Sequence, residues 1–245
     1  MPEPSEYSES GQPIYRYSAQ EPGWQPADMS GSDMEAITAH IEQHLGPLGN
    51  VWHEILSDRV HVDVHHIPPR PERNFHTLIT TGMSDLPMNA PAQAADRKYA
   101  ELLIALPPEW PISDQAYSLD TAPHYWPIHA LRYLARFPHL HDTWLWRGHT
   151  IPNGDPPQPL AAGTQLCCMA LLPPLRVPEA FRELRISPEK TVHFWALVPL
   201  HREEMELKLK RGIDEVTDLL DRSGVDELLN PQRKNVCKRS IWPFG

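Results

Sequence analysis

Alternating apolar and polar residues predict a β-sheet in the first half of the chain. In "VHVDVHHI" (60–67) three valines alternate with polar residues, which is the period-two pattern of a half-buried strand. The stretch "FHTLITTGM" (75–83) follows as a further strand. "YAELLIALPPEW" (99–110) is nearly continuous in apolar residues, so we expect a central strand covered on both faces. Other strands are predicted at "WHEIL", "TWLWRGHTI", "TQLCCMALL", "FRELRI" and "VHFWALVPL".

Apolar residues spaced three and four apart predict helices between these strands. The stretch 32–46 begins with Ser32, an N-cap candidate with a glutamate three residues later, and closes with a glycine. The stretch 125–140 carries an apolar stripe, with Pro127 tolerable in its first turn and Pro138 expected to stop it.

The longest amphipathic pattern covers residues 201–224, where we predict one helix interrupted at Gly212. Because a glycine inside a helix costs about 1 kcal/mol relative to alanine, we expect close packing of its backbone against the sheet. Glu204 and Lys208 are four residues apart, in the order that favours an ion pair. Residues 225–230 are predicted to add a short helical cap.

Strands and helices are mixed without strict alternation, so the predicted fold class is α+β. We expect a mixed, mostly antiparallel sheet packed by two or three main helices, in a single domain at residues 33–229. The 245 residues, of which 40% are hydrophobic, can bury one good-sized core. Residues 1–32, rich in Pro, Ser, Glu and Gln, are predicted to form an acidic disordered tail, and residues 230–245 a basic tail.

The net charge of −10 is unevenly distributed. Residues 1–35 hold seven acidic residues against one arginine, residues 230–245 hold four basic residues and no acid, and the body between them is acidic. Such a field opposes nonspecific binding to nucleic acid and favours a basic partner. The N-terminus is polar, and no apolar run approaches the roughly 20 residues of a membrane span. We therefore predict a cytoplasmic protein with neither a membrane nor a nucleic-acid partner.

The turn after the strand at 75–83 contains Ser84, which raises the question of a nucleophile. A G-x-S-x-G elbow would need a glycine where Leu86 stands. In an architectural turn, Gly82 takes a positive φ, and the side chain of Ser84 or Asp85 hydrogen-bonds the turn's own amides. We favour this architectural interpretation and predict no catalytic residue.

Histidines and an aspartate on one strand are the candidates for a metal site. His61, Asp63 and His65 alternate with valines, so they share one face of the strand and could hold zinc or iron. No H-E-x-x-H or C-x-x-C signature accompanies them, and a solvent-facing polar stripe is also typical of a one-sided antiparallel sheet. We therefore predict no cofactor, and we keep a metal-dependent hydrolase using these three residues as the alternative function.

The order of several segments resembles the bacterial Suppressor of fused-like domain family, over about residues 35–230. The segments are "HTLITTGMSDLPM", "AELLIALPPEWP", a Trp-Pro pair opening a helix that ends "LRYLARFPH", then "LWRGHTIPNG" and "FWALVPLHREEMELKLKRGIDEVTDLLDRSGV". The resemblance implies an α+β domain whose turn at 82–85 is architectural. Its motif positions, which are candidate binding residues expected to serve mainly the architecture, are Gly82, Ser84, Asp85, Trp126, Pro127 and Gly148.

For function, the resemblance implies a protein-binding module. Animal members of the family hold a transcription factor of Hedgehog signalling, and stand-alone bacterial members are associated with polymorphic toxin loci and are proposed to be immunity proteins. An acidic body suits such a role, because toxin domains that attack nucleic acid tend to be basic. The prediction is a non-catalytic protein-binding domain, in its most specific form an immunity protein that neutralises a basic toxin domain.

Overall fold

The computed structural model describes residues 3–17, 23, 25–27, 33–54, 58–112 and 124–238. Ser32, the predicted helix cap, lies outside these residues, and the first helix has Asp33 at its N-cap position. The helices are α1 (Met34–Leu45), α2 (Trp126–Leu140), α3 (Arg202–Arg211) and α4 (Ile213–Arg222), with short 3₁₀ turns at Met83–Asp85, Ala92–Ala94 and Glu179–Phe181. The strands are β1 (Glu6–Tyr7), β2 (Pro13–Ile14), β3 (Val51–Trp52), β4 (Asp63–Ile67), β5 (His76–Thr81), β6 (Ala100–Leu106), β7 (Thr150–Pro152), β8 (Cys168–Leu172), β9 (Glu183–Arg185) and β10 (Thr191–Leu200).

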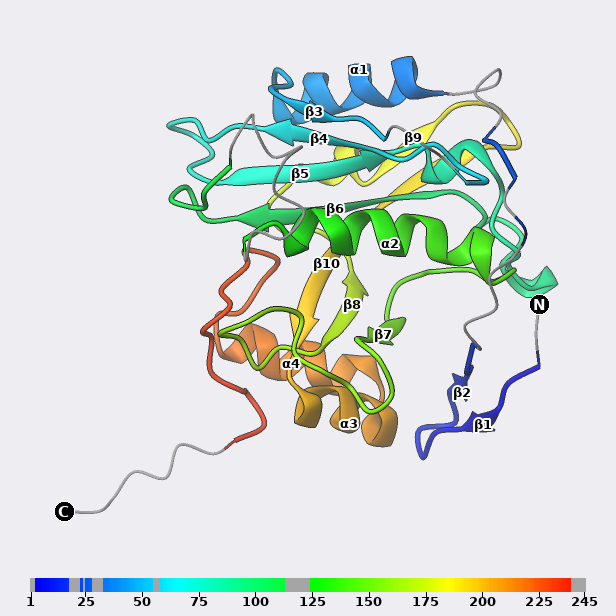
Figure 1. Cartoon of the computed structure of the whole chain (residues 1–245), viewed down its shortest axis with the longest axis vertical. Coiled ribbons are helices and arrows are strands. Elements are labelled where there is room, and N and C mark those ends of the chain that lie inside the picture. The colour runs from blue at the N-terminus through cyan, green and yellow to red at the C-terminus, as the bar shows by residue number, and fades with distance from the viewer. Residues whose placement is uncertain are drawn as a thin grey trace.

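One eight-stranded sheet forms the centre of the molecule, in the order β3-β4-β5-β6-β10-β8-β7, with β9 pairing on β10 (Figure 1). Its pairs are antiparallel except for β6 with β10, which run parallel. The predicted α+β class with a mixed, mostly antiparallel sheet is confirmed. The apolar stretch that predicted a central strand is β6, which lies between β5 and β10 and is buried along its whole length.

Helices cover both faces of this sheet. Helix α2 lies across the middle strands on one face, where Leu131 and Leu134 pack in a cluster with Val64, Leu78 and Leu102 (Figure 1). On the other face a second cluster joins residues of α1 and α4 to the sheet; it includes Ile37, Ile41, Val216, Leu220, Ile79 and Phe194. No helix in the described ranges is long and apolar enough to cross a membrane.

The C-terminal helical pattern differs from the prediction. Gly212 ends α3 and begins α4 with φ 93°, so the chain breaks into two helices there. A Cβ at this position would meet no atom within 4 Å, so backbone conformation and not close packing requires the glycine. Glu204 pairs with Arg233 instead of Lys208. The predicted cap at 225–230 is not helical; its Leu228 forms a parallel β-bridge to β6.

Two other observed element boundaries differ from the predicted ones, each for a local reason. Helix α2 passes through Pro138 and ends at Leu140, because a proline in the last turn removes only one late helical hydrogen bond. Strand β7 is confined to Thr150–Pro152, whereas the stretch before it folds as a loop with a turn that has Gly148 at φ 81°.

Both predicted tails contact the domain where the structure describes them. Residues 3–17 contain the β1–β2 hairpin, and the amide of Ser10 donates to the carbonyl of Leu209 in α3 at 3.0 Å. The hydroxyl of Tyr17 donates to Thr143 at 2.8 Å. Aromatic and polar side chains of residues 3–17 thus have hydrogen-bond partners on the body. At the other end, Arg233 is buried against α3.

Gly148, one of the family motif positions, offers a test of close packing. Its φ is 81°, and a Cβ there would lie 2.9 Å from the side chain of Ile213 at the start of α4. Gly163 has the same φ of 81° but no atom within 4 Å. Both alanine variants carry the cost of a positive φ, and we expect Gly148→Ala to lose about 1 kcal/mol more, because it also overpacks the contact with α4. Urea unfolding of the two variants measures this difference; equal losses would show that Ile213 moves aside freely.

Candidate functional site

The turn after β5 is shaped by a close backbone approach. Gly82 has φ 98°, and a Cβ at this position would overlap the carbonyl oxygen of His61 on the neighbouring chain segment. Only glycine fits such a site without displacing the backbone. The next residues, Met83–Asp85, form one 3₁₀ turn, in which the amide of Asp85 donates to the carbonyl of Gly82 at 3.2 Å. The predicted positive φ of Gly82 is thus present.

We had expected the side chain of Ser84 or Asp85 to bond the amides of the turn, but the hydroxyl of Ser84 has a different partner. Its side chain is fully buried, and both its hydroxyl (2.7 Å) and its amide (3.0 Å) donate to Oε1 of Glu101 in the central strand. The hydroxyl of Thr80 donates to the other carboxylate oxygen at 2.6 Å. Three donors from the end of β5 and the turn therefore converge on one carboxyl group of β6. A hydroxyl enclosed in this way ties the turn to the sheet and is closed to an incoming substrate.

Glu101 is the residue of this cluster that the sequence reasoning missed. Its only signal was a single charged residue in the apolar run "YAELLIAL". The pKa of Glu101 is raised to about 7, mainly because the group is buried. The hydrogen bonds from Thr80 and Ser84 oppose this increase, and the negative charge of Asp85 adds a smaller contribution to it. The group is therefore poised to exchange a proton near neutrality while completely covered by protein.

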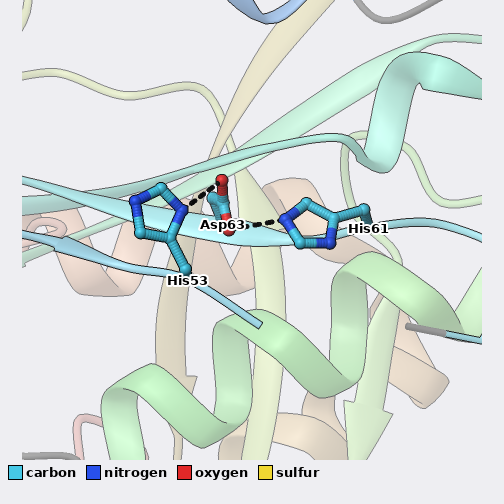
Figure 2. A group of neighbouring side chains, drawn as sticks. All are labelled: His53, His61 and Asp63. Atoms are coloured by element: carbon cyan, nitrogen blue, oxygen red, sulfur yellow. Dashed lines mark hydrogen bonds and ion pairs between the residues drawn. The ribbon is translucent and has the colours of Figure 1, made fainter. Parts of the chain in front are cut away.

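A second polar cluster lies where β4 begins. Figure 2 shows Asp63 between two imidazole rings. Its Oδ2 is 2.9 Å from Nδ1 of His53, and its Oδ1 is 3.0 Å from Nε2 of His61. The side chain of Asp63 is 1% exposed, that of His61 14%, and that of His53 62%. The three ligand atoms all lie within 4.8 Å of one another, so these residues could hold a metal ion.

His65 is not part of this cluster, although we had grouped it with His61 and Asp63. Its Nε2 lies 3.0 Å from the hydroxyl of Thr81, and burial lowers its pKa to about 4. The expected solvent-facing stripe is wrong as well, because Asp63 and His65 are both buried. His53 joins the cluster because of the register of the sheet, which the sequence analysis did not consider. Trp52 pairs with Val64 in antiparallel strands, so His53 lies opposite Asp63.

Helix α2 fixes the segment that supplies His53. The guanidinium of Arg132 donates to the carbonyls of Trp52 (2.9 Å) and His53 (3.2 Å). One turn further along, Arg136 forms an ion pair with Glu54. The backbone that carries the exposed imidazole is thereby held against a well-packed helix.

The helix-start motif lies apart from both polar clusters. Trp126 is the first residue of α2, and its ring contacts that of Trp110 edge to face, with centroids 6.4 Å apart. Pro127 follows in the first turn, beside a cavity of only about 10 Å³. At the far end of α2, His139 reaches the carbonyl of Met83 at 2.9 Å. Thirteen residues of helix separate the two ends by about 20 Å, so Trp126 and the turn at Ser84 do not form one site.

An open groove runs beside the turn. Its volume is about 380 Å³, and it lies between the residues that follow the turn and the end of α2. Its lining mixes apolar and polar side chains, among them Arg59, Leu86, Pro87, Asn89, His139 and Asp142.

Comparison with known proteins gives one family and several solved folds. The sequence model of the Suppressor of fused protein (SUFU) family matches residues 58–234. A SUFU homologue from Neisseria gonorrhoeae is similar at 16% identity and TM-score 0.59, covering 87% of this chain and 100% of that one. The chain matches no curated protein.

Two further solved structures share the fold. The structure of the Sufu–Fu complex is similar at 16% identity and TM-score 0.59, covering 86% of this chain and 93% of that one. Drosophila Suppressor of Fused is similar at 17% identity and TM-score 0.57; the match covers 89% of this chain but only 54% of the Drosophila chain. The family resemblance inferred from the order of the segments is confirmed.

Proposed function

This chain belongs to the Suppressor of fused protein family, and from that premise we propose that it works by binding another protein and not by catalysis. The observation that carries the proposal is the match over residues 58–234, which includes the whole sheet from β4 to β10 and helices α2 to α4. A similar solved structure is a complex, that of Sufu with Fu. A protein with this fold thus forms a specific complex.

The hydrogen bonds of the buried polar residues support a structural role for these residues and not a catalytic one. Ser84, the residue that most resembles a nucleophile in the sequence, is buried and hydrogen-bonded to Glu101, so its hydroxyl serves the architecture of the turn. The metal-dependent hydrolase that we had considered loses His65, whose ring is hydrogen-bonded to Thr81 on the neighbouring strand β5.

The charge of the surface indicates the kind of partner. Helix α4 packs Val216 and Leu220 into the core and leaves an exposed acidic face on its other side. This acidic face of α4 consists of Asp214, Glu215, Asp218 and Asp221. Arg147 and Arg222 each pair with one of these acids, yet Asp214 and Asp218 remain 80% and 65% exposed. Such a surface attracts a basic polypeptide over a distance and accelerates the encounter. In its specific form, the proposal is an immunity protein that binds and neutralises a basic toxin domain.

Neutralising the acidic face of α4 should slow binding. The variant Asp214→Asn, Glu215→Gln, Asp218→Asn, Asp221→Asn is expected to associate about tenfold more slowly with a basic partner at low salt, because steering depends on the local field. The difference should disappear at high ionic strength, where exposed charges are screened. Pull-down with the full chain supplies the partner, and surface plasmon resonance across a salt series measures the rates.

A matched variant separates local from overall charge. Neutralising four exposed glutamates elsewhere changes the net charge equally; suitable positions are Glu72, Glu109, Glu179 and Glu189. Equal slowing by both variants would show that only total charge matters, and salt-independent binding would remove the electrostatic proposal. Co-expression tests the immunity role: the chain should restore growth to cells that produce the recovered partner. A harmless partner would overturn that role and leave protein binding intact.

A further inference from the structure

We propose that His53, His61 and Asp63 form a binding site for a divalent transition-metal ion of the zinc class. The three residues come from two adjacent segments, the one that follows β3 and the one that opens β4. Figure 2 shows both imidazole rings directed toward the same carboxyl group from opposite sides. This site is independent of the protein-binding function, and it uses a different residue set from the one that the sequence pattern indicates.

The distances are close to those of a coordination sphere. Zinc binds imidazole nitrogen and carboxylate oxygen at about 2.0–2.1 Å, which in tetrahedral geometry places ligand atoms about 3.3 Å apart. The observed separations are 2.9 Å between His53 Nδ1 and Asp63 Oδ2 and 3.0 Å between His61 Nε2 and Asp63 Oδ1. The two nitrogens contact different oxygens of the carboxylate, and the three ligand atoms lie within 4.8 Å of one another. To bind one ion, each nitrogen must therefore move away from its oxygen and toward the other nitrogen, which rotation of the exposed His53 side chain provides.

The donor types select the ion. Two imidazole nitrogens and one carboxylate oxygen suit zinc and its neighbours in the first transition row, and are a poor set for calcium or magnesium, which prefer oxygen ligands. The carboxylate of Asp63 is 1% exposed, so a cation at this position would neutralise a charge that water cannot reach.

Surrounding contacts hold the ligands in place. The amide of Glu54 donates to Oδ1 of Asp63 at 3.3 Å, and Arg132 fixes the carbonyl of His53. The carbonyl of His61 lies against Gly82, where no side chain would fit. Outer contacts of this kind orient the ligands of known metal sites.

One side of the site is accessible. The imidazole of His53 is 62% exposed, whereas His61 and Asp63 lie beneath it. An ion can therefore enter from solvent past His53 without unfolding of the strand. Three protein ligands leave a fourth position for water or for a donor group of a bound partner.

Zinc titration of the full-length protein tests the site. After treatment with a chelator, competition against a chromophoric zinc ligand should give one zinc per chain, and Co²⁺ should give the absorption bands of a tetrahedral site. His53→Gln is the key variant, because an exposed side chain can be replaced with little effect on folding. It should weaken zinc binding at least about 100-fold and abolish the cobalt bands, as should His61→Gln.

The chain has 14 histidines, so a control must show that zinc is not bound by histidines outside the site. His40 and His44 lie one turn apart on α1 with ring centroids 4.6 Å apart, so they are the type of pair that binds zinc adventitiously. His44→Gln should leave the affinity for the one tightly bound zinc ion unchanged. Zinc binding that survives His53→Gln, or that falls equally in His44→Gln, would overturn the proposal. Thermal unfolding gives a second measurement: saturating zinc should raise the midpoint by about 5 °C in the wild type and leave His53→Gln unchanged.

Discussion

Replacing Arg233 with alanine should lower the free energy of unfolding by about 3–5 kcal/mol, although the sequence placed this residue in a basic tail. Its guanidinium makes a bidentate pair with Glu204 in the first turn of α3, at 2.7 Å and 2.5 Å. The side chains are 8% and 0% exposed. Removal of one partner would leave a buried carboxylate without its counter-charge, and this uncompensated charge is the source of the large cost.

The rest of the network shows why the carboxylate cannot simply become neutral. Burial by itself would raise the pKa of Glu204, but the hydrogen bonds and the charge of Arg233 hold it below the ordinary range. The amides of His201 (2.8 Å) and Val236 (2.9 Å) also donate to the carboxylate. Glu204 thereby joins the start of α3 to the C-terminal segment, and Arg233→Ala should release that segment.

Lys238 provides the matched control for Arg233. It pairs with Glu203 on the same helix at 3.1 Å, but the two side chains are 63% and 41% exposed. Lys238→Ala should therefore cost less than about 1 kcal/mol. Urea unfolding of both variants measures the difference, and similar small losses would show that water reaches Glu204. The double variant Glu204→Leu, Arg233→Met should recover most of the stability lost in Arg233→Ala, because it buries no unpaired charge.

Hydrophobic periodicity predicted the centre of the fold well. The run at 99–110 is β6, the run at 192–200 lies within β10, and the helical stripe at 125–140 is α2. In each case the local pattern and the burial required by the sheet agree. The same signal failed at 143–151, where "TWLWRGHTI" has strand-like residues but only its end pairs with β8.

Polar contacts between distant segments could not be predicted from the sequence. The pairing of Glu204 with Arg233 spans 29 residues, whereas the i,i+4 rule points to Lys208. The trio of His61, Asp63 and His65 followed from strand alternation alone, which cannot tell that Thr81 takes one histidine while another arrives from the adjacent segment. Such partners depend on register and layer packing, and these are set by the whole sheet.

Protonation of Glu101 should make the stability of the whole domain depend on pH. Burial raises its pKa from the ordinary 4.5 to about 7, so the folded protein holds this proton more tightly than the unfolded chain does. Between these values the native state binds more protons, and the free energy of unfolding must fall as pH rises. The contribution is fully present below about pH 4.5 and is lost by about pH 7, with a total of up to about 3 kcal/mol.

Glu101→Gln isolates this contribution, because the amide has a similar shape and stays neutral at every pH. Relative to the wild type, we expect the variant to gain up to about 3 kcal/mol between pH 4.5 and pH 7. Urea unfolding at a series of pH values measures both proteins, and other titrating groups, such as Glu227, cancel in the difference. Glu72 is exposed, so for the control variant Glu72→Gln the free energy of unfolding should change with pH in the same way as for the wild type. Parallel curves for Glu101→Gln would mean that the donors of Thr80 and Ser84 hold the pKa near its ordinary value.

Ser84→Ala tests the same cluster from the turn. It removes one of the hydrogen bonds that favour the charged carboxylate, so the pKa of Glu101 should rise further and the loss of stability should extend to higher pH. A serine that merely filled space would instead lower stability equally at all pH values. The direction of this shift decides whether the hydroxyl of Ser84 stabilises the carboxylate of the central strand, which is the reason that a serine in this turn needs no catalytic role.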